Sequence, residues 1–231
     1  ENKNHVFVGL RKLISELRAK GECPIARDTI IYINSPNEGE VYLNSTRHLN
    51  VDATNSFDLT RASIEGHLQT EQLVELLKKH VPGFENCYIS NITPILGVRE
   101  TRRIMGKKKL TADKITKGEV PEDTIALASY KIDIHSGTSD STIFTTVEEP
   151  YGIPYGCLVA REIKGLMMSG RAISVDAVVF GSTRVMATCM AVGEAAGVGA
   201  ALAVKNDILP EEVDPAHVRK ILSENGAILN M

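Results

Sequence analysis

Apolar residues recur at helical spacing near the start of the chain, from Leu10 to Leu17, and the pattern stops at Gly21. This spacing predicts an amphipathic helix. Two runs typical of strands follow at residues 29–34 and 40–44. The sequence Ser-Pro-Asn-Glu-Gly separates them, which predicts a hairpin with a loop of five residues.

A longer helical pattern begins near Asp58 or Thr60, either of which suits an N-cap, and it ends before Pro82. Asp214 followed by Pro215 predicts the start of the last helix. Between these helices the pattern predicts a short helix at 111–118, a polar loop at 136–141, and extended segments at 88–93, 95–99, 124–134, 142–147 and 157–160. Strands with long connections and few helices predict an α+β fold with a mixed or antiparallel sheet.

The last part of the chain carries a more specific pattern: a short apolar run at 166–169, a Gly170-Arg171 turn, a loop and a long small-residue helix at 184–204. Gly193, Gly197 and Gly199 lie inside this predicted helix, where each glycine costs about 1 kcal/mol relative to alanine. Such glycines indicate close approach to the backbone by a strand, a helix or a cofactor. From the residues alone, the more frequent explanation is a small-residue helix packed on a sheet.

Composition narrows the function. The 231 residues include 26 basic and 29 acidic side chains, and this balance argues against a general nucleic-acid binder. No apolar run approaches the length that spans a bilayer, so we expect no membrane contact. The four cysteines are widely scattered and form no Cys-x-x-Cys pair, so no metal site or redox disulfide is predicted.

Two segments, GLMMSGRAIS (165–174) and STRVMATCMAVGEAAGVGAALAVK (182–205), resemble the C-terminal FAD-contacting region of FAD-dependent oxidoreductases. Within that family, the resemblance is to the glutathione-reductase-like flavoproteins related in part to the heterodisulfide reductase A subunit. It continues upstream through FDLTRASIEG, KKHVPGFENCYI, ILGVRETRRIMGKKKLTADKI, YKIDIHS and EEPYGIPYGCLV. Nearly the whole chain is covered, in family order.

The resemblance implies a substrate domain at 1–160 and, at 161–231, the C-terminal part of a Rossmann-like FAD-binding domain. The Gly-x-Gly-x-x-Gly turn that cradles the FAD pyrophosphate in such domains occurs nowhere in these 231 residues. We therefore expect a C-terminal fragment that lacks the N-terminal FAD-binding half. Its expected partners are that missing half, a small-molecule substrate and a second copy of the chain.

The resemblance also implies site residues. Gly170 would let the backbone pass close to FAD, with Arg171 orienting the pyrophosphate or ribityl chain. Backbone N–H groups at the start of the long helix would stabilise negative charge on the reduced flavin. The predicted cofactor-binding residues are Gly170, Arg171, Ala172, Ile173, Arg184, Val185, Met186, Ala187 and Thr188.

Three residues are candidates for catalysis. His135 follows a strand-like run and precedes a polar loop, a place that suits a general acid or base, although a lone histidine is more often structural. Arg99 and Arg102, together with their neighbour Arg103, could bind a substrate carboxylate or phosphate. Equally, Glu100 and these arginines suit a structural ion-pair network.

The resulting function, assigned to the intact parent protein, is hydride transfer through the N5 atom of FAD on an unidentified substrate. We expect the fragment alone to be inactive and to bind FAD weakly or not at all. The alternative is a non-catalytic folded module that binds a substrate or subunit and cannot hold FAD. A third hypothesis gives the helix and turn another ligand, such as a sugar phosphate.

Overall fold

The computed structural model describes residues 6–135 and 142–230, with only the backbone of 133–135 and 142–145. These residues divide into two compact units, one ending at Val98 and the other running from Arg99 to the C-terminal helix. The expected division at residue 160 was one of family domains. That division stays a prediction. The two compact units separate after Val98, and this boundary does not show where one family domain ends and the next begins.

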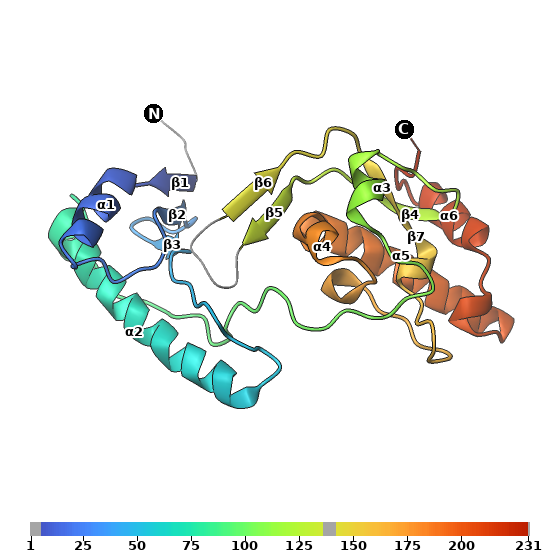
Figure 1. Ribbon diagram of the computed structural model, residues 1–231, viewed down its shortest axis with the longest axis horizontal. Coiled ribbons are helices and arrows are strands. Elements are labelled where there is room, and N and C mark those ends of the chain that lie inside the picture. The colour runs from blue at the N-terminus through green and yellow to red at the C-terminus, as the bar shows by residue number, and fades with distance from the viewer. Residues whose placement is uncertain (1–5, 136–141, 231) are drawn as a thin grey trace. The chain divides into compact units, whose positions relative to one another are not determined.

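The first unit is a small antiparallel sheet of order β1-β2-β3 with two helices (Figure 1). The hairpin is confirmed, and the Ser35 hydroxyl donates to the Glu40 carboxylate across its loop at 2.6 Å. The segments at 88–93 and 95–99 form no strand. The elements are β1 (Val6–Gly9), α1 (Arg11–Ala19), β2 (Ile30–Asn34), β3 (Val41–Leu43) and α2 (Ser56–His80).

Helix α2 begins earlier than expected because Asn55 is its N-cap, its side chain accepting from the Phe57 backbone N–H at 2.9 Å. Asp58, one of the two predicted caps, instead accepts from the backbone N–H of Asp52 in the preceding loop. The helix ends before Pro82, as predicted. Its C-terminal half packs on α1 and the sheet through a core formed by Ile14, Leu17, Ile25, Ile30, Leu73, Leu76 and Leu77.

The second unit contains two separate antiparallel strand pairs, β4 with β7 and β5 with β6, so the α+β class is confirmed. The expected run at 124–134 is broken into two strands, and the residues at 157–160 and 166–169 make only isolated bridges. Its elements are α3 (Ala112–Thr116), β4 (Thr124–Ala128), β5 (Ile132–His135), β6 (Thr142–Thr145), β7 (Tyr151–Pro154), η1 (Tyr155–Cys157), η2 (Gly170–Ala172), α4 (Ala177–Thr183), α5 (Met186–Asn206), η3 (Pro210–Glu212) and α6 (Pro215–Glu224).

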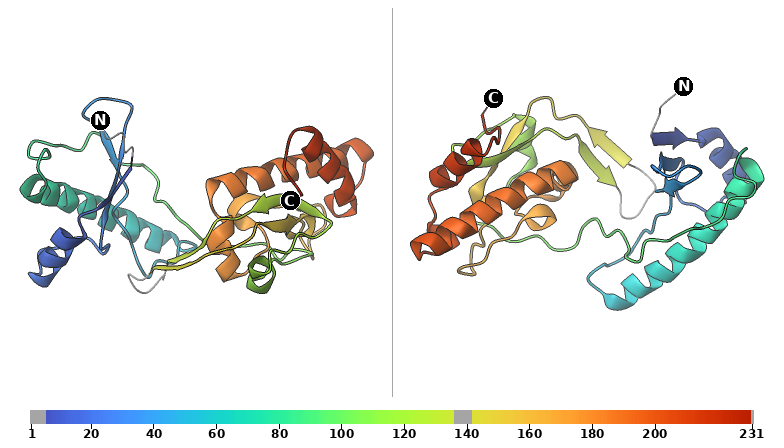
Figure 2. Two further views of the ribbon diagram at one scale, coloured as in Figure 1. Left: turned by 90° about the horizontal axis from the view of Figure 1, so that it is seen from above. Right: turned by 180° about the vertical axis from the view of Figure 1, so that it is seen from behind.

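Helices α5 and α6 pack on each other and on β4 (Figure 2). One stripe of α5 is buried, formed by Thr188, Val192, Ala195, Gly199 and Ala203. Within the described part of the chain, only one of its three interior glycines is closely approached by another residue. A Cβ at Gly199 would lie 2.7 Å from the hydroxyl oxygen of buried Tyr155, whereas Gly193 and Gly197 have no such neighbour within 4 Å.

The expectation that no apolar run reaches membrane-spanning length was wrong. Helix α5 has 21 residues and a mean hydropathy of 1.6, enough to cross a bilayer by length and composition alone. One such helix is weak evidence for a membrane span, because a core helix passes the same test. Only 28% of the apolar stretch of α5 is buried in the described structure, so α5 is not covered to the extent of a core helix, and its buried part is a single stripe.

An unpredicted helix, α4, stands where a loop was expected between the glycine turn and α5. Asp176 explains its start, because the carboxylate accepts from the Val179 N–H at 2.7 Å and caps the helix. The other carboxylate oxygen accepts from the Ala112 N–H in the first turn of α3, at 2.8 Å. A single side chain therefore joins the first turns of two helices that are 64 residues apart in the sequence.

Candidate functional site

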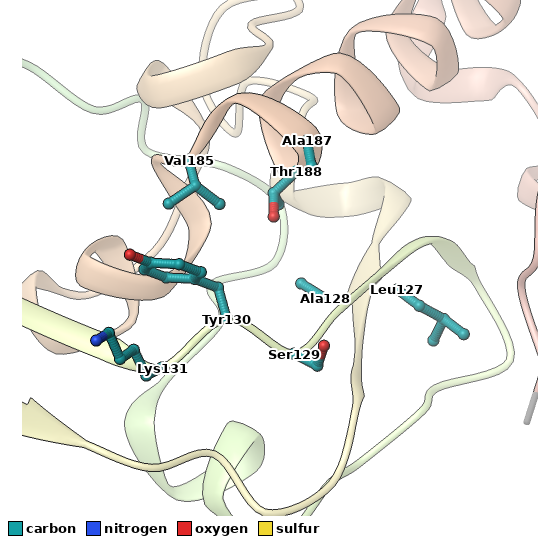
Figure 3. A pocket seen from close by; sticks show the side chains of 8 residues that line it. All are labelled: Leu127, Ala128, Ser129, Tyr130, Lys131, Val185, Ala187 and Thr188. Atoms are coloured by element: carbon teal, nitrogen blue, oxygen red, sulfur yellow. The ribbon is translucent and has the colours of Figure 1, made fainter. Parts of the chain in front are cut away.

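The second unit has a hollow of about 550 Å³ between the link that joins β4 to β5 and the start of α5 (Figure 3). We call residues Ser129–Lys131 the link, since they lie between Ala128, the end of β4, and Ile132, the start of β5. The hollow is lined by Leu127, Ala128, Ser129, Tyr130, Lys131, Val185, Ala187 and Thr188.

The start of α5 forms one wall of this hollow. Its N-cap is Val185, and no side chain caps the helix. Backbone N–H groups in the first turn of a helix have no intrahelical partner, and the helix dipole adds partial positive charge there. Ala187 is exposed in this turn, and Figure 3 shows the Thr188 hydroxyl pointing toward the link. This wall therefore suits an electron-rich or anionic ligand edge.

The predicted glycine turn lies beside the same helix end. Gly170 opens η2 with φ 61°, in the left-handed region that favours glycine. A Cβ built on it would lie 4.0 Å from the Cβ and Sγ atoms of Cys189, in the first turns of α5. The carbonyl of Ala172 accepts from the Ile104 N–H at 2.8 Å, which fixes the turn against the residues that follow Arg99.

Not every predicted cofactor residue can use its side chain there. Ile173 is 1% exposed and belongs to the hydrophobic core. Arg184 does not lie in the first turn of α5, because it is the C-cap of α4 and its N–H bonds the Phe180 carbonyl. Met186 is the first residue of α5 and its side chain is 83% exposed.

The candidate catalytic arginines occupy different settings. Arg171 donates through Nη1 to the Arg99 carbonyl at 3.3 Å, so the glycine turn and the start of the second unit are in contact. Arg102 is exposed. The alternative of a structural ion pair applies to their neighbour Arg103, whose guanidinium pairs with the Glu100 carboxylate. The central carbon of this guanidinium lies 5.3 Å from the centre of the Phe180 ring. His135 is the last residue of β5, and its side chain lies outside the described residues.

The Cys189 thiol and the Tyr151 phenol remain protonated at neutral pH. Burial raises the pKa of Cys189, and the neighbouring Arg171 guanidinium only partly opposes this shift. A raised pKa makes this thiol a poor nucleophile. Burial also raises the pKa of Tyr151 to about 12, although Ser182 accepts its proton in a hydrogen bond. Among the described residues, no group of three His, Cys, Asp or Glu side chains is placed to hold a metal ion.

A family model, FAD dependent oxidoreductase, matches residues 11–222. The chain belongs to this family. Neither the search of curated proteins nor that of solved structures gave a match. The match covers both compact units and includes the hollow, the glycine turn and α5. Family membership therefore suggests a flavin-dependent redox function.

The site of this FAD-dependent oxidoreductase family member contains residues that the sequence pattern did not reveal. The link brings Tyr130 and Lys131 to the hollow, whereas the apolar pattern of 124–134 had predicted one uninterrupted extended run. The break in apolar character at Ser129-Tyr130-Lys131 was the available signal. Their position opposite α5 depends on contacts between residues more than fifty positions apart, which no local pattern encodes.

The residues lining the hollow fit the isoalloxazine ring system of a flavin. The link contributes an aromatic side chain and α5 contributes backbone donors, and none of the eight described lining residues is acidic. Reduced flavin carries negative charge at N1 and O2, which backbone donors at a helix start stabilise. The glycine turn lies beside Cys189 in the first turns of α5, next to this wall of the hollow.

Proposed function

We propose that this chain holds the isoalloxazine end of FAD in the hollow and supports hydride transfer to or from a small molecule. The observation that carries this proposal is the start of α5, which lines the hollow and receives no side-chain cap. When bound, FAD supplies the hydride-accepting or hydride-donating atom, N5. The family resemblance to glutathione-reductase-like flavoproteins supports the same assignment.

In this proposal the residues around the hollow have distinct roles. The N–H groups of Ala187 and Thr188 stabilise negative charge at the ligand edge that faces α5. The glycine turn holds Arg171 beside the residues after Arg99, where its guanidinium adds positive charge. Tyr130 and Lys131 bound the opposite side of the hollow. His135 and Arg102 remain candidates for proton transfer and substrate binding.

We further propose that the pyrophosphate half of the cofactor site comes from a dinucleotide-binding βαβ unit that these 231 residues do not contain. The Gly-x-Gly-x-x-Gly turn is missing from them, and it normally supplies the main pyrophosphate contacts. An apolar face of α5 is open and suits packing against such a unit. The side chains of Met186, Met190 and Val204 on this face are 83%, 74% and 83% exposed.

Titration with riboflavin and FAD tests both proposals, the isoalloxazine site in the hollow and the pyrophosphate site outside these 231 residues. If the chain supplies only the isoalloxazine end, the two dissociation constants should agree within about threefold, a difference below about 1 kcal/mol. Binding of riboflavin with this ratio supports the proposal. FAD binding that is a hundredfold tighter would show that the pyrophosphate site is complete within the chain.

A pair of variants on one helix locates the binding site. Ala187→Phe fills the hollow from an exposed position and should abolish riboflavin binding. Gly193→Ala lies on the same helix outside the hollow, where an added methyl group meets no atom within 4 Å, and should leave binding unchanged. Equal binding by both variants would refute the assignment of the hollow.

The non-catalytic module is the second candidate, and the missing glycine-rich turn favours it. It predicts that neither riboflavin nor FAD binds the chain at any accessible concentration. Self-association through the exposed face of α5 belongs to the same alternative. Sedimentation that shows a monomer, together with measurable flavin binding, would exclude it.

A further inference from the structure

The link that forms one wall of the hollow is not held by either strand ladder. The β4–β7 ladder ends at the pair Ala128–Tyr151, and the β5–β6 ladder begins at Ile132. The link therefore spans two strand pairs that belong to different sheets. Some other contact has to fix its distance from α5.

A buried chain of hydroxyl groups supplies that contact. Tyr151 donates from its hydroxyl to the Ser182 hydroxyl oxygen at 2.6 Å, and the Ser182 hydroxyl donates to the carbonyl of Tyr130 in the link. The side chains of Tyr151 and Ser182 are both 0% exposed. The Ser182 hydroxyl has one proton and donates it to the Tyr130 carbonyl. The Tyr151 phenol is therefore the donor in the hydrogen bond between Tyr151 and Ser182.

Ser182 is also close in sequence to the other wall. It lies in the last turn of α4, three residues before Val185, the N-cap of α5. A hydrogen bond from Ser182 to Tyr130 therefore connects the link to the start of α5. Buried hydroxyl chains of this kind fix one arrangement, because any displacement leaves a polar group without a partner in a medium of low dielectric.

We propose that Ser182, supported by Tyr151, is a positioning residue that sets the separation between the link and the start of α5. This inference rests on the proposed function, since that separation defines the space for the isoalloxazine ring. Burial raises the pKa of the Tyr151 phenol to about 12, so the phenol remains the donor to Ser182 between pH 6 and 9. Neither residue lines the hollow, so neither touches the ligand.

Two variants separate positioning from stability. Ser182→Ala leaves the Tyr151 phenol buried without a partner, so it should lower the denaturation midpoint and weaken riboflavin binding. The double variant Ser182→Ala with Tyr151→Phe removes that unpartnered phenol and should recover most of the midpoint. It cannot restore the bond to Tyr130, so riboflavin binding should stay about tenfold weaker and amide exchange in 129–131 should stay fast.

Thr183→Val is the matched control. Thr183 is the adjacent buried residue, and its hydroxyl donates within α4 to the Val179 carbonyl, so its loss should not change exchange in the link. A double variant with normal exchange in 129–131 and normal riboflavin affinity would overturn the proposal. Failure of the unmodified chain to bind riboflavin would instead overturn the proposed function, and the exchange data alone would then decide whether Ser182 holds the link.

Discussion

Ala187→Asp should have opposite effects on the empty protein and on the flavin-loaded protein. Ala187 is exposed in the first turn of α5, where a carboxylate interacts favourably with the helix dipole. The empty protein should therefore gain about 0.3–1 kcal/mol of unfolding free energy. Thr188→Asp cannot be used in the same way, because Thr188 is 5% exposed and a buried carboxylate would destabilise the fold.

In the loaded protein the same carboxylate opposes the negative charge of reduced flavin. For two charges about 6 Å apart and an effective dielectric constant of about 40, the repulsion is about 1.4 kcal/mol. This corresponds to a fall of about 30 mV in a two-electron reduction potential. Because Ala187 is exposed, salt should reduce the shift, and at 1 M the screening length is only about 3 Å.

The assay compares Ala187→Asp with its neutral control Ala187→Asn. Urea denaturation of the empty proteins gives the change in unfolding free energy, and dye-coupled reduction of the loaded proteins gives the potential. Equal potentials for the two variants would refute the proposed role of the α5 start. A lower stability for Ala187→Asp would refute the reading of this turn as open to solvent.

Three further outcomes follow from packing, capping and burial. Gly199→Ala should lower the unfolding free energy by about 1–3 kcal/mol, whereas Gly193→Ala, its control on the same helix, should raise it by about 0.5–1 kcal/mol, both measured by urea denaturation. Asp176→Ala should cost about 1–2 kcal/mol by the same measurement, and an unchanged midpoint would contradict its double capping role. Burial raises the pKa of Tyr151 and of Cys157 to about 12, so the folded protein keeps these two protons to a higher pH than the unfolded chain does. The stability that this contributes is complete below pH 9 and should be lost between pH 9 and 12; denaturation midpoints that stay flat over that window would contradict it.

Local chemistry fixed those parts of the protein that the sequence predicted correctly. The Ser35–Glu40 hairpin, the Asp214-Pro215 start of α6 and the left-handed Gly170 turn each depend on residues a few positions apart. Capping, the fixed φ of proline and the freedom of glycine act within such short segments. Family membership was also visible from the sequence, through segments whose order extends along the chain.

Contacts over long distances in the sequence decided the rest. The expected loop before α5 became α4, whose cap residue Asp176 also binds a backbone N–H in α3. The extended run 124–134 is divided into two strands, and Ser182, about fifty residues away, donates to the carbonyl of Tyr130 between them. Three glycines in α5 look equivalent in the sequence, but only Gly199 meets Tyr155. The sequence shows which residues can permit a close approach, and only the packed chain determines which of them are approached, because burial depends on neighbours that no local pattern specifies.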